Sequence, residues 1–309
     1  MGKIAFLFAG QGAQYSGMGK TLYETSAAAK ALYDAAEAIR PGTMQQSFSG
    51  TDEELKQTAN TQPCLYLVDL AAARALEENG IHADAAAGFS LGEIAALAFA
   101  GAYSDADGFR IVSTRGQLMQ EASDAAETAM CAVVKLDAKT VADAAAEFEQ
   151  LYAVNFNCPG QTVVSGLSSS MPAFTAKIKE LGGRCIPLKV SAAFHSPVMQ
   201  DASAEFGKVL ADYDFTGTTI PVYANLTAQP YESDAAKMRD TLQQQMCSPV
   251  RWQETIENLI ADGFDTFIEV GAGMTLSGLV KKISRDVRIL NVDSAEDLEE
   301  TRKAVLGEC

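Results

Sequence analysis

The sequence is poor in the basic side chains that several classes of protein need. It has 24 lysines and arginines against 40 acidic residues and only two histidines, for a net charge of −16. Nucleic-acid-binding proteins present a basic surface, and no run of basic residues supplies one here. The charge therefore argues against a nucleic-acid partner, and we attribute it to solubility.

Cysteines are also few, and none forms a recognisable pair. The six cysteines stand singly, without the C-x-x-C spacing of a metal or redox site. We therefore predict neither a disulfide framework nor a metal site, and reduced cysteines favour a cytoplasmic location. No apolar run approaches the ~18 residues of a membrane span. The apolar run Ile4–Phe8 is too short for a signal sequence.

A short motif flanked by glycines gives the strongest indication of chemistry. Residues Gly88–Glu93 read G-F-S-L-G-E, and G-x-S-x-G at the start of a helix is typical of a nucleophile elbow. The glycines permit a sharp turn from strand to helix that presents the serine hydroxyl. Ser90 is the predicted nucleophile, although a serine near a helix start is also a common N-cap.

A serine nucleophile needs a base, and the two histidines are the candidates. His82 lies eight residues before Ser90. A strand between them would separate the two by about 26 Å, at ~3.3 Å per residue. His195 stands just before Ser196-Pro197, a helix start whose positive end should keep the imidazole neutral. By elimination we predict His195 as the base; the alternative is a histidine that fills a cap pocket.

Strands and helices alternate along most of the chain, which predicts an α/β fold with a mostly parallel sheet. The elbow makes the predicted core α/β-hydrolase-like, although the strand it needs at 84–88 contains three alanines that favour helix. Residues 128–192 have the order β-α-β-β-α-β of a ferredoxin-like unit. We therefore predict a large domain, 1–127 and 193–309, with 128–192 as an inserted subdomain.

Predicted helices and strands outside the elbow follow from periodicity and from turn residues. Long helices are predicted over 21–39, 64–78, 104–122, 196–213 and 249–262. The strands expected in the subdomain are 130–136, 151–156, 161–165 and 184–190.

Six blocks of the sequence, taken in order, carry a resemblance that covers nearly the whole chain. They are Ala9–Gln14, Gly88–Glu93, Arg115–Gln120, Asn155–Gly166, Ala193–Pro197 and Pro249–Trp252. Together they resemble the malonyl-CoA:acyl-carrier-protein transacylases of fatty-acid synthesis. The resemblance implies that Ser90 takes a malonyl group from coenzyme A as an ester. Ser90 would then give it to the phosphopantetheine thiol of acyl carrier protein, with His195 moving the protons.

The resemblance also implies roles for five further residues. Backbone N–H groups of Gln11 and Leu91 would form the oxyanion hole, and Arg115 would hold the free carboxylate of the malonyl group. Gln245 would mark the segment whose backbone carbonyl orients the base. Phe194 would crowd the carbon next to the thioester and so disfavour branched acyl groups; it is equally well explained as a core residue.

Two positions depart from the family pattern, which usually has His where Phe89 stands and Pro where Ala9 stands. We expect an altered rate or substrate preference rather than loss of activity. Three other functions stay open: a serine hydrolase or thioesterase, a non-catalytic acyl-CoA or carrier-protein binding module, and a discrete acyltransferase of polyketide synthesis. Net hydrolysis, binding without a serine ester, or a different carrier would distinguish them.

Docking of acyl carrier protein, which is itself acidic, needs a local basic patch on this acidic chain. The densest patch comprises Lys281, Lys282, Arg285 and Arg288. Arg184 and Lys189 form another near the subdomain, where we expect the carrier to dock.

Overall fold

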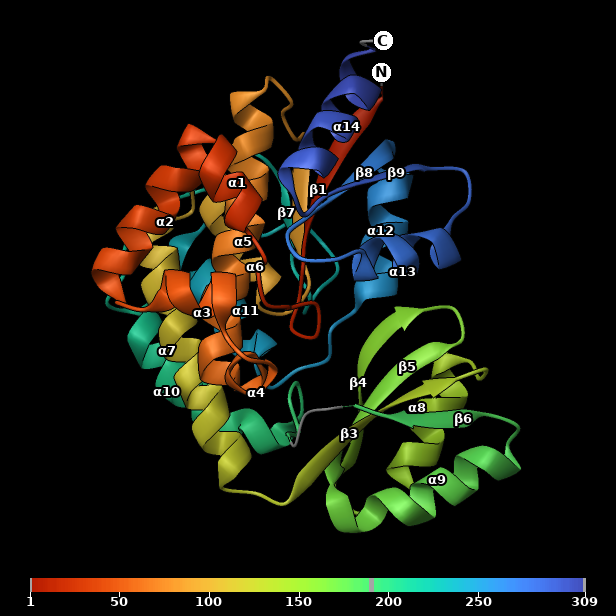
Figure 1. Cartoon of the computed structure of the whole chain (residues 1–309). Coiled ribbons are helices and arrows are strands. Elements are labelled where there is room, and N and C mark those ends of the chain that lie inside the picture. Colours follow the sequence, from red (N-terminus) through yellow and green to blue (C-terminus); the bar gives the residue numbers. More distant parts are fainter. Residues whose placement is uncertain (1, 189–191, 308–309) are drawn as a thin grey trace.

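The computed structural model describes residues 2–188 and 192–307, and two β-sheets organise them (Figure 1). The larger sheet has the strand order β7-β2-β1-β8-β9, and each neighbouring pair is parallel. Its strands are β1 (Lys3–Phe8), β2 (Ala85–Gly88), β7 (Val222–Tyr223), β8 (Phe264–Val270) and β9 (Arg288–Val292). The prediction of an α/β fold with a mostly parallel sheet is confirmed.

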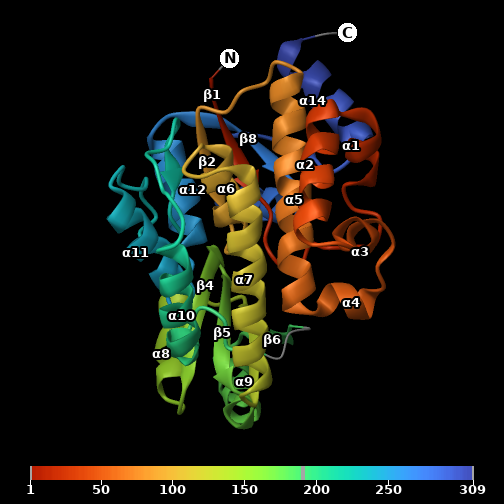
Figure 2. The ribbon, with the colours of Figure 1, turned by 90° about the vertical axis from the view of Figure 1, so that its left-hand side faces the viewer.

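Helices cover both faces of the parallel sheet. Figure 2 shows the layer on one face, formed mainly by α2 (Ala27–Ile39), α5 (Thr58–Glu78), α6 (Gly92–Phe99) and α7 (Asp105–Asp124). The opposite face carries α12 (Trp252–Ala261) and α13 (Thr275–Ile283). Successive side chains of a strand point to opposite faces. Phe6 and Phe8 accordingly pack toward α5 and α6, whereas Ala5 and Leu7 pack toward α12 and α13.

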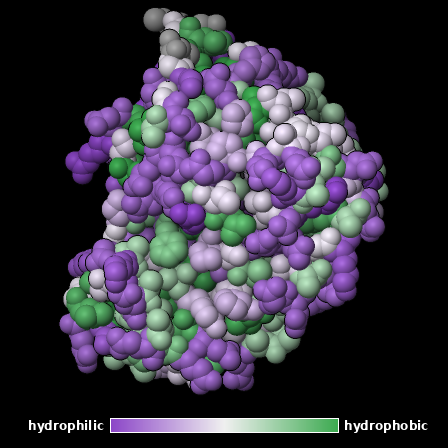
Figure 3. Space-filling view, turned by 180° about the vertical axis from the view of Figure 1, so that it is seen from behind, coloured by the Kyte–Doolittle hydropathy of each residue, from purple (hydrophilic) through white to green (hydrophobic). Residues whose placement is uncertain are grey.

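In the described part of the chain, six further helices complete the large body around these layers. They are α1 (Lys20–Thr25), α3 (Thr43–Ser49), α4 (Asp52–Lys56), α10 (Gln200–Leu210), α11 (Ala235–Gln245) and α14 (Ala295–Leu306), with a 3₁₀ turn at Pro197–Met199. Among the described residues, no helix is both long and apolar enough to cross a membrane. Hydrophilic residues cover much of the face shown in Figure 3, with hydrophobic ones between them.

The smaller sheet is antiparallel and lies at the carboxyl ends of the parallel strands (Figure 1). Its strands, in the order β4-β5-β3-β6, are β3 (Thr128–Val134), β4 (Leu151–Cys158), β5 (Gln161–Leu167) and β6 (Arg184–Pro187). Two helices, α8 (Ala138–Ala146) and α9 (Met171–Glu180), enclose a separate core with it, and a 3₁₀ turn precedes α9 at Ser168–Ser170. The predicted last strand, 184–190, ends at Pro187, and residues 189–191 lie outside the described part.

Strand β4 also joins the small sheet to the large body. The backbone N–H of Val250 donates to the carbonyl of Val154 at 2.8 Å, and that of Phe156 donates to the carbonyl of Val250 at 2.9 Å. One edge of the small sheet is therefore fixed to the segment that leads into α12.

Several helix boundaries differ from the predictions. Helix α5 begins at Thr58 and contains Pro63, so it starts six residues before the predicted 64. The predicted helix 21–39 divides at Ser26, whose hydroxyl oxygen accepts from the Ala29 N–H at 3.1 Å and caps α2. Helices α11 and α14 were not predicted. In α11 only Met238 and Leu242 form an apolar stripe among polar residues, which leaves little periodicity to detect.

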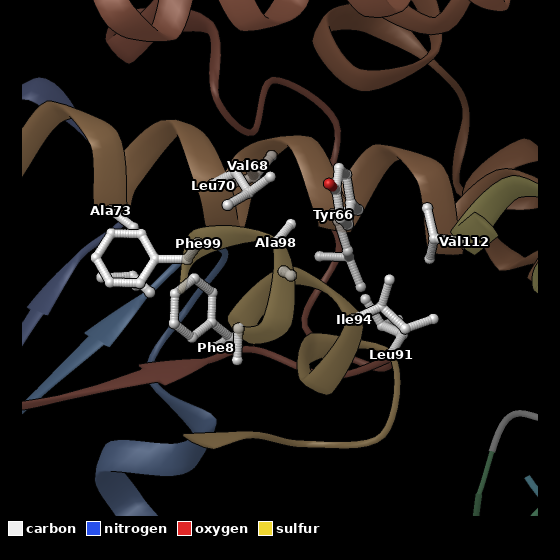
Figure 4. Close-up of a cluster of buried hydrophobic side chains, with 14 of the residues drawn as sticks. Phe8, Tyr66, Val68, Leu70, Ala73, Leu91, Ile94, Ala98, Phe99 and Val112 are labelled. Atoms are coloured by element: carbon white, nitrogen blue, oxygen red, sulfur yellow. The ribbon is translucent and has the colours of Figure 1, made fainter. Parts of the chain in front are cut away.

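Close packing of helix α6 explains why the elbow needs its glycines. Figure 4 shows Ile94, Ala98 and Phe99 of α6 between Phe8 of β1 and the side chains of α5. A Cβ atom on Gly92 would lie 2.3 Å from the carbonyl oxygen of Phe8, and one on Gly88 would lie 2.0 Å from the backbone of Gly92. Any larger residue would push the helix away from the sheet.

The three alanines before the elbow do form the predicted strand. Ala85, Ala86 and Ala87 are wholly buried, and they pair with β1 on one side and β7 on the other. The two neighbouring strands satisfy the backbone hydrogen bonds of β2 on both of its edges, and small side chains fit a strand that is buried on both faces. Together these effects outweigh the helix propensity of alanine.

Candidate active site

Ser90 occupies the turn between β2 and α6 in a conformation that needs external support. Its φ is 55°, in the left-handed region that non-glycine residues rarely adopt. Two side-chain amides hold the turn: Ser90 N–H donates to Asn225 Oδ1 at 2.7 Å, and Gln245 Nε2 donates to Ser90 O at 2.7 Å. Asn225 Nδ2 also donates to the Gly88 carbonyl at 2.7 Å. The turn is thus clamped by segments more than 130 residues away in sequence.

His195 lies directly beside Ser90. The distance from Ser90 Oγ to His195 Nε2 is 2.7 Å, and that from His195 Nδ1 to the backbone oxygen of Gln245 is 2.9 Å. A carbonyl oxygen only accepts, so Nδ1 carries the proton and Nε2 is free to accept from the serine hydroxyl. Burial and then the positive charge of Arg115 lower the pKa of His195 to about 4. The imidazole is therefore neutral at neutral pH, as a general base must be. His82, by contrast, is exposed in a loop.

The glycine-rich loop after β1 lies against the elbow. A Cβ atom on Gly10 would lie 2.8 Å from the carbonyl oxygen of Phe89, so only glycine permits this approach. The loop brings Gln11 to the cavity in front of Ser90. Neither the Gln11 N–H nor the Leu91 N–H has a hydrogen-bond partner among the described residues. Both remain free to donate to a ligand.

Arg115 reaches the nucleophile from the middle of α7. Its side chain is wholly buried; Nη2 donates to Ser90 Oγ at 3.2 Å and to Gln245 Oε1 at 2.8 Å, and Nη1 donates to Gln62 Oε1 at 2.9 Å. Within the described residues it makes no ion pair, and its Nε–H has no partner. Burial lowers the pKa of Arg115 to about 10, which leaves it charged at neutral pH. The site therefore contains a buried positive charge whose hydrogen-bond partners in the described part of the chain are all neutral side chains.

A cavity of about 710 Å³ opens in front of Ser90 and His195. Strand β4 supplies one wall, where Asn155 and Asn157 are each 7% exposed and their Oδ1 atoms have no hydrogen-bond partner among the described residues. Phe194 also lines the cavity and is 7% exposed. Its place next to the base agrees with a role in acyl-group size and equally with packing.

The two departures from the family pattern each have a structural counterpart. Phe89 lines the cavity and packs edge-on against Trp252, with ring centroids 5.4 Å apart. Ala9 is buried, and its N–H donates to the carbonyl of Val270 at 3.3 Å. A proline at position 9 could not donate this bond, so alanine adds a link between β1 and β8.

Four residues that contact the site were not predicted from the sequence: Gln62, Glu93, Asn225 and Tyr231. Glu93 is the last residue of the elbow motif, and it is wholly buried. The apolar residues that follow it, Ile94–Ala100, surround the helix on every side, which is typical of a buried helix and could have revealed this. The other three carry no local signal.

Three comparisons with known proteins each find similarity to acyl transferases. Residues 5–303 match the model of the acyl transferase domain family. A malonyl CoA-acyl carrier protein transacylase of Bacillus subtilis (strain 168) is 43% identical over 305 residues, which cover 97% of this chain and 96% of that protein. The crystal structure of such a transacylase from Clostridium perfringens has a TM-score of 0.94 and 34% identity, covering 99% and 98% of the two chains.

A further solved structure, at a TM-score of 0.94 and 31% identity, is a malonyl-transacylase in complex with a type II PKS acyl-carrier protein. The match covers 98% of this chain and 99% of that transacylase chain. Full-length similarity of sequence and of structure, together with a histidine and an arginine that both contact one serine, leads to one assignment. The chain belongs to the acyl transferase family and, within it, to the malonyl-CoA:acyl-carrier-protein transacylases.

Proposed function

We propose that this chain moves the malonyl group from malonyl-CoA to the phosphopantetheine thiol of acyl carrier protein through an ester on Ser90. In the first half, His195 Nε2 takes the proton of Ser90 Oγ as this oxygen attacks the thioester carbon. The C–S bond then breaks, and His195 returns the proton to the sulfur of coenzyme A. In the second half the carrier thiol gives its proton to His195 and attacks the ester, and Ser90 leaves with that proton.

The buried charge of Arg115 is the observation that carries this proposal. A malonyl group ends in a carboxylate, and a guanidinium binds a carboxylate through two parallel hydrogen bonds. Arg115 has a free Nε–H, no ion pair among the described residues, and an Nη2 atom 3.2 Å from the nucleophile. A simple serine hydrolase or thioesterase would have no use for such a group.

The negative charge that develops on the thioester oxygen during attack by Ser90 needs hydrogen-bond donors close to that oxygen. The N–H groups of Gln11 and Leu91 are free, and that of Leu91 belongs to the first turn at the start of α6. Helix N-termini favour negative charge, and one such donor is worth ~10²–10³ in rate. We assign these two N–H groups to the oxyanion hole.

The finer description of the fold belongs to the same proposal. An elbow between β2 and α6 in a parallel sheet supports an α/β-hydrolase-like core, and the order β-α-β-β-α-β supports a ferredoxin-like unit. We place the domain boundaries as the sequence suggested, with 1–127 and 193–309 forming the large domain and 128–192 the inserted subdomain.

We assign the reaction to fatty-acid synthesis, with malonyl-CoA as substrate and no permanently bound cofactor. The second candidate is supply of malonyl groups to a polyketide carrier, because one structural relative is in complex with a type II PKS acyl-carrier protein. Exposed Lys281, Lys282, Arg285 and Arg184 are available for carrier docking, whereas Lys189 lies outside the described residues.

Intact-protein mass spectrometry after brief mixing with malonyl-CoA tests the proposal. A malonyl-sized adduct should form on the wild type, should be absent from Ser90→Ala, and should be discharged by acyl carrier protein faster than by water. No adduct on the wild type would favour a binding module. An adduct lost only to water would favour a hydrolase.

A further inference from the structure

A buried carboxylate lies beneath the nucleophile, in the first turn of α6. Glu93 is wholly buried and makes no ion pair among the residues that the structure describes. Its Oε2 accepts from the backbone N–H of Asn225 at 2.8 Å and from Gln245 Nε2 at 3.3 Å, and its Oε1 accepts from the hydroxyl of Tyr231. Burying a carboxylate is costly unless donors surround it. The three donors, all from outside α6, therefore hold the Glu93 carboxylate in one position.

Gln245 connects this carboxylate to the reacting groups. The two ends of its amide are unlike, because the nitrogen only donates and the oxygen only accepts. The nitrogen donates to Ser90 O and Glu93, and the oxygen accepts from Arg115 Nη2 at 2.8 Å. A flipped amide would point its N–H groups at the guanidinium and its oxygen at the carboxylate. Glu93 thus helps to fix the one orientation that can hold Arg115.

We infer that Glu93 is a positioning residue for substrate choice: it fixes the Gln245 amide and thereby keeps the Arg115 guanidinium beside Ser90. This inference rests on the proposed function, in which Arg115 takes the free carboxylate of the acyl group. Gln62 holds the other end of the guanidinium at 2.9 Å. Loss of the Glu93 link should therefore displace Arg115 and not release it.

The positioning role does not depend on the ionisation of Glu93. Burial raises the pKa of Glu93 to about 7, against the opposing effects of Tyr231, Asn225, Gln245 and Arg115. A proton added to the carboxyl would go to Oε1, where the Tyr231 oxygen can accept it. Oε2 would then still accept from Gln245, so the amide keeps its orientation in both states.

The test compares malonyl-CoA with acetyl-CoA, which lacks the second carboxylate. Glu93→Met removes the acceptor while keeping a side chain of similar length. Its kcat/KM for malonyl transfer to acyl carrier protein should fall about 10-fold further than its kcat/KM for acetyl transfer. Equal losses for the two substrates would mean that Glu93 supports only the fold, and this would overturn the inference.

Four further variants keep the test decisive. Glu93→Gln retains an acceptor for Gln245 and a donor for Tyr231, so it should keep the malonyl preference of the wild type; failure to do so would overturn the inference. If Glu93→Met does not fold, Glu93→Asp, whose shorter side chain cannot span both partners, should lower the preference instead. Asp69→Asn is the control, because Asp69 is an equally buried carboxylate without a hydrogen-bond partner among the described residues.

The fourth variant, Gln245→Met, closes a double-mutant cycle. In its background Glu93→Met, or Glu93→Asp in its place, should lower the malonyl preference no further, because the link is already broken. An additional loss of preference there would contradict action through Gln245. A wild type that does not prefer malonyl-CoA would instead refute the proposed function.

Discussion

Two groups of buried polar side chains belong to the active site: one supports the Ser90 turn and the other lines the cavity, and they differ in how completely they are hydrogen-bonded. The elbow platform, which comprises Glu93, Asn225 and Gln245, has a partner for every side-chain oxygen and nitrogen. The cavity wall, which comprises Asn155 and Asn157 of β4, leaves both amide oxygens without a partner among the described residues.

This difference separates the part that must be fixed from the part that must receive a ligand. A fully satisfied network in a buried site is rigid, and it can hold Ser90 in its left-handed conformation. An unpartnered buried oxygen costs free energy in the free protein, and that cost is recovered when a donor arrives. Substitutions on the platform should therefore affect stability and rate together, whereas those on the wall should affect binding.

Loss of the base should have the largest effect. His195→Ala should lower the rate of Ser90 acylation by about 10³- to 10⁴-fold, because no other neutral imidazole lies near the nucleophile. Rapid-quench measurement of the malonyl-enzyme would record this rate. A decrease below about 10-fold would show that another group deprotonates Ser90.

Loss of one platform amide should reduce both stability and rate. Asn225→Ala removes the acceptor of the Ser90 N–H and the donor to the Gly88 carbonyl, so the free energy of unfolding should fall by about 2–4 kcal/mol. Urea unfolding measures this, and Asn258→Ala, which removes one hydrogen bond to the Ala228 carbonyl far from the nucleophile, is the matched control. An Asn225→Ala protein with unchanged stability would contradict the clamp.

Acid should weaken the fold through His195. Its pKa is about 4 in the folded protein and near 6.5 in the unfolded chain, so the unfolded chain binds the proton first. The stabilisation is present above pH ~6.5 and is lost as the pH falls toward ~4, by about 3 kcal/mol in all. Urea unfolding of the wild type and of His195→Gln between these pH values would isolate this contribution. Parallel stability curves would contradict it.

The smallest effect is expected on the wall. Asn157→Ala should raise the KM for malonyl-CoA about 3- to 10-fold and leave kcat within about 2-fold, because only a contact to bound substrate is lost. Its stability should not decrease, since an unpartnered oxygen is removed. Steady-state kinetics and thermal unfolding measure these effects. A destabilised variant with an unchanged KM would show that Asn157 supports the fold and does not bind substrate.

Local sequence patterns were sufficient to predict one part of this site and not the other. The elbow and the parallel sheet follow from glycine spacing and periodicity, and His195 is the candidate base by elimination between two histidines. Asn225, Gln62 and Tyr231 could not be predicted, because each reaches the site only through the tertiary fold and its neighbours in sequence form no motif. The roles of the site residues, the docking surface and the cytoplasmic location remain predictions.

The central claim is that a buried arginine beside the nucleophile selects an acyl group with a free carboxylate. Comparing kcat/KM for malonyl-CoA and acetyl-CoA in the wild type and in Arg115→Ala tests it most directly. We predict that the variant loses about 10²-fold or more in malonyl transfer and keeps or gains acetyl transfer, as expected when a charge-assisted pair is removed. An equal loss for both substrates would contradict the account, because Arg115 would then serve only to support Ser90.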